Sequence, residues 1–72
     1  MFPAGRGHVV PANGGWAVTI DNAPECVSQH RIQVSAIMIG RHLAQSTQAE
    51  LLIHGRDGQV RKCWHYPGAY GK

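Results

Sequence analysis

The sequence predicts an α+β fold in which an antiparallel sheet is covered on one face by a single helix. Three observations support this prediction. Apolar and polar residues alternate with period two in both halves of the chain, as is typical of half-buried strands. Apolar residues recur at helical spacing between those regions. An Asn-Gly and an Asp-Gly pair mark tight turns within the two strand regions. Together they predict the order β-β-β-α-β-β, which forms a two-layer sandwich.

The first strand region predicts a hairpin of residues 8–10 and 16–20. If Asn13 and Gly14 are the central residues of a type I′ turn, Val9 faces Val18, and the next pair follows in register. The predicted core face carries Val9, Trp16, Val18 and Ile20, and the opposite face carries His8, Val10, Ala17 and Thr19. A turn at residues 21–24 then leads to a third strand at about residues 25–29, with Val27 as its one large aliphatic residue.

The middle of the chain predicts an amphipathic helix of roughly four turns, from about Arg31 to Ser46. Its apolar residues recur at intervals of three and four, so they share one side of the helix. That predicted buried stripe contains Ile32, Ala36, Ile39, Gly40 and Leu43.

The second strand region predicts a hairpin of residues 50–54 and 59–64 around Asp57-Gly58. In the expected register the core face carries Leu51, Ile53, Val60 and Trp64, with Lys62 at its edge. The other face carries Leu52, His54, Arg61 and Cys63.

Length and composition predict one domain over residues 8–64, with a flexible leader at 1–7 and a flexible tail at 65–72. A hydrophobic fraction of 43% and a charged fraction of 15% are typical of a chain that folds. No apolar stretch is long enough for a membrane span or a secretory leader. We therefore expect a cytoplasmic protein without membrane attachment, in which Cys26 and Cys63 are reduced.

Several blocks of sequence resemble a known family. They are His8-Val9-Val10-Pro11, Gly15-Trp16-Ala17-Val18, Ala36-Ile37 with Gly40-Arg41 and Ala44, Glu50-Leu51, and Ile53-His54-Gly55-Arg56-Asp57-Gly58. In this order and spacing they closely resemble the bacterial domain-of-unknown-function family DUF2188. The resemblance spans residues 8 to about 62. It implies a small bacterial protein with no assigned activity, cofactor or catalytic residue.

The predicted sheet face away from the helix is a candidate binding surface. A single helix covers one face only, so the other meets solvent or a partner. With a formal net charge of +3, the chain suits an anionic partner, either nucleic acid or an acidic protein. The residues predicted to contact it are His8, Thr19, His54, Arg56 and Arg61. The segment 54–58 has two interpretations, a phosphate-binding loop or a plain hairpin turn, and turn chemistry favours the second.

An alternative function is a homo-oligomeric or protein-interaction domain. Apolar residues outside the buried stripe of the helix would form its interface, namely Val34, Ile37 and Met38. A core this small also favours a second subunit.

Catalysis, cofactors and metals are not expected. The chain has no Ser-His-Asp order, no paired carboxylates and no nucleophile elbow, so we expect a non-catalytic binding or adaptor module. Cys26, Cys63 and His65 match no usual zinc spacing, and we interpret both cysteines as free and buried.

Overall fold

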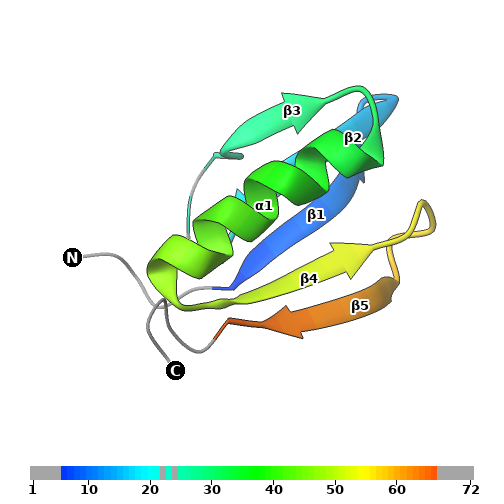
Figure 1. The fold of residues 1–72 in the computed structure, drawn as a ribbon. Coiled ribbons are helices and arrows are strands. Elements are labelled where there is room, and N and C mark those ends of the chain that lie inside the picture. Colours follow the sequence, from blue (N-terminus) through cyan, green and yellow to red (C-terminus); the bar gives the residue numbers. More distant parts are fainter. Residues whose placement is uncertain (1–5, 22, 24, 67–72) are drawn as a thin grey trace.

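The structure is a computed structural model, and it describes residues 6–21, 23 and 25–66. Five strands form one sheet, and a single helix lies across one of its faces (Figure 1). The elements follow the predicted order β-β-β-α-β-β, and the α+β class is confirmed. Their bounds are β1 Gly7–Ala12, β2 Gly15–Ile20, β3 Ser28–His30, α1 Gln33–Thr47, β4 Glu50–His54 and β5 Val60–His65.

The sheet has the strand order β3-β2-β1-β4-β5, and it is mixed instead of wholly antiparallel. Three neighbouring pairs are antiparallel, but β1 and β4 are parallel, with Val9 opposite Ile53. The helix explains this difference. Strand β3 runs parallel to β1 because both are antiparallel to β2, and α1 then carries the chain back along the sheet. The strand that follows a crossover helix starts at the same end and is therefore parallel.

The first hairpin has the predicted register. Val9 lies opposite Val18, and Val10 lies opposite Ala17. Asn13 and Gly14 have φ angles of 51° and 79°, as a type I′ turn requires at both central positions. The third strand is shorter and later than expected, because it covers residues 28–30 and leaves Val27 exposed.

The second hairpin departs from the predicted register at its turn. The amide of Gly58 donates to the Gly55 carbonyl, and Gly58 has a φ of 86°, so the turn contains an extra residue in the left-handed region. A bulge follows, and it pairs Val60 with His54 and Lys62 with Ile53. Val60 therefore lies on the face away from the helix, contrary to the prediction, while Lys62 lies on the helix face.

The helix buries a stripe of small residues. Ala36, Gly40 and Ala44 follow each other at intervals of four and are fully covered, with Ile37 and Leu43 packed beside them. The predicted stripe was partly wrong, because Ile32 and Ile39 are exposed. Small side chains let the helix approach the sheet closely, and this rotates the larger flanking residues out of the contact. Ile32 is the N-cap and has no side-chain cap bond.

The core lies between α1 and the helix side of the sheet. Its buried apolar members are Val9, Trp16, Val18, Ala36, Ala44, Leu51 and Ile53. Tyr66 packs against this cluster, and strands β1 and β5 extend to Gly7 and His65. The rest of the expected leader (1–5) and tail (67–72) lies outside the described residues.

Candidate anion-binding cleft

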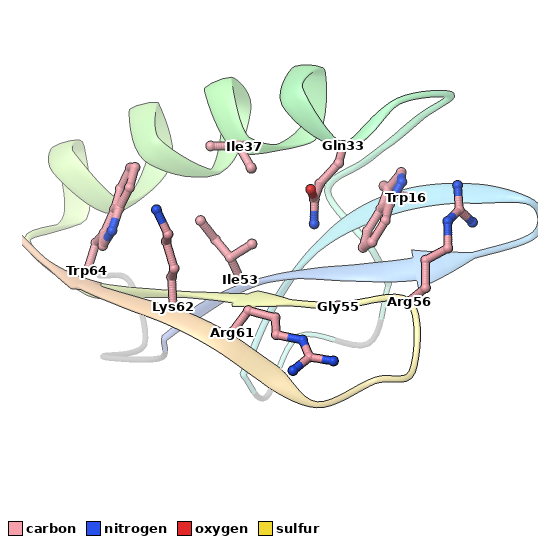
Figure 2. Close-up of a pocket in the computed structure, with 9 residues that line it drawn as sticks. All are labelled: Trp16, Gln33, Ile37, Ile53, Gly55, Arg56, Arg61, Lys62 and Trp64. Carbon is pink, nitrogen blue, oxygen red and sulfur yellow. The ribbon is translucent and has the colours of Figure 1, made fainter.

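A cleft of about 510 Å³ lies between α1 and the β4–β5 hairpin, on the helix side of the sheet (Figure 2). The cleft exists because α1 packs mainly on β1 and β2 and less on β3 and β4. The helix therefore covers less of β5, the outermost strand of the sheet. The residues that line it are Trp16, Gln33, Ile37, Ile53, Gly55, Arg56, Arg61, Lys62 and Trp64.

Each end of the cleft pairs an indole ring with cationic side chains, as Figure 2 shows for Trp16 and Arg56 and for Trp64 and Lys62. The Arg56 guanidinium carbon lies 5.4 Å from the centroid of the Trp16 ring. At the other end, Lys62 Nζ lies 5.8 Å and the Arg41 guanidinium carbon 5.3 Å from the centroid of Trp64. These distances are in the range of cation–π contacts.

The two tryptophans differ in exposure. Trp16 is 5% exposed and forms part of the floor, whereas Trp64 is half-buried on the edge strand, where its ring meets Tyr66 edge to face. The apolar side chains of Ile37 and Ile53 lie between the two ends. The cleft thus has an apolar floor, with Trp16 and one cation at one end and Trp64 and two cations at the other.

The electrostatic character of the cleft is positive. Of the nine described residues that line it, three are Arg or Lys and none is acidic. Arg61 is partly neutralised, since its guanidinium lies 2.8 Å from the Asp57 carboxylate. It also lies across Gly55, where a Cβ would come within 2.7 Å of the Arg61 Nε atom. Gly55 therefore permits the position of Arg61.

The five residues predicted for the open sheet face lie in two separate places. His8, Thr19 and His54 do share that face, because His8 pairs with Thr19 in the register and its ring contacts the ring of His54. Arg56 and Arg61 line the cleft on the helix side instead. No described element covers the open face, as Figure 1 shows, but most of the positive charge of the second hairpin lies on the other side.

The histidines of the open face form a hydrogen-bonded chain. His8 Nε2 lies 2.7 Å from Asp21 Oδ1, His8 Nδ1 lies 3.1 Å from His54 Nε2, and His54 Nδ1 lies 2.9 Å from the Gly58 carbonyl. The hydrogen bond from the His8 ring lowers the pKa of Asp21 below its usual range, and the backbone amide of Arg6 adds to this effect. Asp21 therefore stays ionised.

The three residues predicted for an oligomer interface do not lie on one face of α1. Val34 and Met38 are 58% and 65% exposed on the outer face of α1. Ile37 packs against the core and lines the cleft, so it does not share that face.

The cysteines and the described acidic and histidine side chains show no metal centre. Cys26 and Cys63 are free, but both are exposed, and the prediction that they are buried was wrong. Among residues 6–21, 23 and 25–66, no three His, Cys, Asp or Glu side chains are placed to hold a metal ion. Within the same residues, α1 is too short and too polar to cross a membrane.

Sequence reasoning missed the cleft and its residues Gln33, Lys62 and Trp64. A signal was present in the alternation of β5, which places Lys62 and Trp64 on the same face as Ile53. A lysine on the inner face of a strand indicates that the helix does not cover this strand, because a buried ammonium group is costly.

The fold and cleft define the class of protein as a small α+β domain with a positively charged groove at one edge of its sheet. Residues 7–66 match a family described as uncharacterized protein conserved in bacteria (DUF2188). The match covers most of the chain, which therefore belongs to the DUF2188 family. This match confirms the resemblance seen in the sequence. No curated protein and no solved structure matches the chain significantly.

Proposed function

We propose that this protein is a non-catalytic cytoplasmic module that binds single-stranded nucleic acid in the cleft between α1 and the β4–β5 hairpin. The observation that carries the proposal is the combination of indole rings with unopposed cations along one groove. Nucleic-acid single strands present phosphates and planar bases in alternation, and their binding sites combine positive grooves with aromatic side chains.

The cleft suits this ligand better than the open sheet face. The open face presents histidines, Thr19 and apolar residues, and its carboxylate Asp21 is ionised. The cleft instead holds Arg56 and Lys62, and neither residue has a carboxylate partner among the described ion pairs. Phosphate binding depends on cations whose charge is not already balanced.

A non-catalytic role is supported by the acidic residues. The carboxylates of Asp21, Asp57 and Glu50 lie against Arg or His side chains at separate places. None of these three lines the cleft. Imidazole and carboxyl groups are the commonest general acids and bases, and none of the nine described residues that line the cleft carries one.

Fluorescence anisotropy of a labelled, mixed-sequence single-stranded oligonucleotide tests the proposal at several salt concentrations. Arg56→Ala and Lys62→Ala should each weaken binding and reduce the slope of log affinity against log salt by roughly one phosphate contact, about 0.7 for a single strand. Trp64→Leu should weaken binding about fivefold or more, because stacking of a base on an aromatic ring contributes about 1–3 kcal/mol.

Two matched variants control this experiment. Arg31→Ala removes a charge outside the cleft that, like that of Lys62, has no carboxylate partner among the described ion pairs, and it should leave the affinity within about twofold. Thr19→Glu adds a negative charge to the open sheet face and should also have little effect. Equal losses in Arg31→Ala and Lys62→Ala would reduce the binding to nonspecific charge attraction, and a large loss in Thr19→Glu would assign it to the sheet face. The absence of binding at low salt would refute the proposal.

A second candidate function is homo-oligomerisation through the outer face of α1. The exposure of Val34 and Met38 favours it, because large apolar side chains side by side on a helix surface are a common interface signal. Light scattering should then report a species heavier than the 7.8 kDa monomer. Met38→Glu should return it to the monomer, whereas Gln59→Glu, an exposed position of the second hairpin, should not. A monomer at millimolar concentration would contradict this candidate.

A further inference from the structure

The hydrogen-bonded chain on the open sheet face needs more protons than its rings carry when neutral. Its two ends are acceptors, the Asp21 carboxylate and the Gly58 carbonyl. Three hydrogen bonds therefore need three N–H groups from His8 and His54. A neutral imidazole carries one N–H, so two neutral rings supply two, and one further proton is required.

The assignment of the protons follows from the ends of the chain. His54 Nδ1 donates to the Gly58 carbonyl, which leaves its Nε2 as the acceptor facing His8. His8 must then donate from Nδ1 to His54 and from Nε2 to Asp21, so His8 is an imidazolium beside an ionised carboxylate. The lowered pKa of Asp21, caused first by this His8 hydrogen bond, is consistent with that arrangement.

We propose that His8 and His54 share one extra proton, and that this proton links the two parallel central strands of the sheet. His8 belongs to β1 and His54 to β4. Their pairing is the junction between the strands before the helix and the strands after it, and it is short, with three residue pairs from Gly7 opposite Leu51 to Val9 opposite Ile53. The His8–His54 contact adds a side-chain hydrogen bond across this junction.

Loss of the proton breaks this particular bond. The 2.7 Å bond from His8 to Asp21 is charge-assisted and persists in a neutral ring, as does the bond from His54 to Gly58. The lone pairs of His8 Nδ1 and His54 Nε2 then face each other at 3.1 Å without a hydrogen between them. Their repulsion separates the rings and weakens the β1–β4 junction. This inference does not depend on the proposed nucleic-acid function.

Other charged and polar groups lie near the hydrogen-bonded chain of Asp21, His8, His54 and Gly58. Arg6 approaches Asp21 from the segment before β1, and Thr19 of β2 is the neutral cross-strand neighbour of His8. In the turn after β4, Asp57 and Arg61 pair with each other, and Glu50 of β4 lies beside His65 of β5. Arg56 lies over Trp16 on the helix side.

Nuclear magnetic resonance of the full ¹⁵N-labelled chain over a range of pH tests the proposal. Below the transition, His8 should carry hydrogens on both ring nitrogens while His54 carries one on Nδ1. Above it, His8 Nδ1 should lose its hydrogen while His8 Nε2 and His54 Nδ1 keep theirs. After correction for intrinsic pH dependence, amides paired across β1 and β4 should then exchange about fivefold faster, as expected for the loss of one hydrogen bond.

Two variants test the link. In Asp21→Asn the side-chain amide can donate to His8 Nε2, so two neutral rings satisfy the whole chain, and exchange at the β1–β4 junction should become insensitive to this transition. In His54→Ala the side-chain bond across the junction is absent, so exchange at the β1–β4 junction should no longer respond to pH in this way.

Specific results would overturn the proposal. One is a His8 ring with a single hydrogen at low pH while the His8–His54 contact persists. Another is junction exchange in the wild type that does not change when His8 Nδ1 loses its hydrogen. A third is an unchanged junction response in Asp21→Asn. If a variant does not fold, as judged from its amide spectrum, the first two results, which need only the wild-type chain, still decide the proposal.

Discussion

Gly40 of α1 packs directly on Leu51 of β4, and a Cβ atom at position 40 would lie 2.9 Å from the Leu51 Cδ1 atom and 3.3 Å from Val9 Cγ2. Leu51 and Val9 are both fully buried, so neither side chain has free space to move into. The distance between helix and sheet therefore depends on the absence of a side chain at this position.

We expect Gly40→Val to destabilise the protein by about 2 kcal/mol, the usual cost of overpacking a close-packed core. Gly40→Ala should cost less, because the gain in helix propensity of about 1 kcal/mol offsets part of the clash. Urea unfolding followed by circular dichroism measures both. Gln45→Val, at an exposed helix position, controls for the propensity of valine, and an equal loss there would contradict the packing explanation.

Gly15 makes the corresponding close approach between β2 and β3. A Cβ at this position would collide with the backbone carbonyl oxygen of His30, which cannot move without breaking the strand pair. Gly15→Ala should therefore release β3 and lower the free energy of unfolding by about 2 kcal/mol. Gly7→Ala is the control, because its Cβ would meet Leu51 Cδ1 at an ordinary 3.4 Å. Similar losses in the two variants would refute the role of Gly15.

Leu51 is the largest fully buried side chain. Leu51→Ala should cost about 2–5 kcal/mol through lost burial and the cavity left behind. Since a domain of this size is stabilised by only about 3–5 kcal/mol, the variant should be largely unfolded at room temperature. Leu52→Ala removes the same atoms from the half-buried opposite face and should stay folded, with a loss of about 1 kcal/mol. Amide spectra of both variants check this contrast.

Asp21 should make the stability of the protein sensitive to acid. Its folded-state pKa is lowered from 3.8, first by the hydrogen bond from His8, so ionised Asp21 stabilises the folded state at pH values above 3.8. This contribution is lost as the pH falls through the lowered pKa. Chemical unfolding between neutral and acidic pH should show a decline that Asp21→Asn reduces. A decline of the same size in the variant would assign the acid sensitivity to other carboxylates.

Short-range signals predicted the first hairpin and the helix well. The Asn13-Gly14 pair by itself selects a type I′ turn, and the turn sets Val9 opposite Val18. The helix was predicted to within two residues at either end. Its rotation was predicted less well, because hydrophobicity alone ranks Ile39 above Ala44, whereas close packing on the sheet selects the smaller residue.

The sequence identified residues of the candidate site but did not predict where they lie in the fold. Arg56 and Arg61 were identified as binding residues, but Arg56 belongs to the turn and Arg61 is the extra residue between the pairs Ile53–Lys62 and His54–Val60, and both line the cleft and not the open face. An extra residue in a bulge changes the face of the side chains next to it, because side chains alternate with period two, whereas Lys62 and Trp64 beyond the bulge keep the predicted face. The chemical type of the site was thus visible in the chain, and its position was not.

The sequence by itself determined the α+β class, the order of elements, the first hairpin register and the family, because turn chemistry and periodicity act between near neighbours. Only the tertiary structure decided the parallel pairing of β1 with β4, the cleft beside Trp64 and the contact of His8 with His54. These features join segments about forty residues apart, such as His8 and His54, separated by 46 positions. Their geometry depends on how the helix crosses the sheet, which no local pattern encodes.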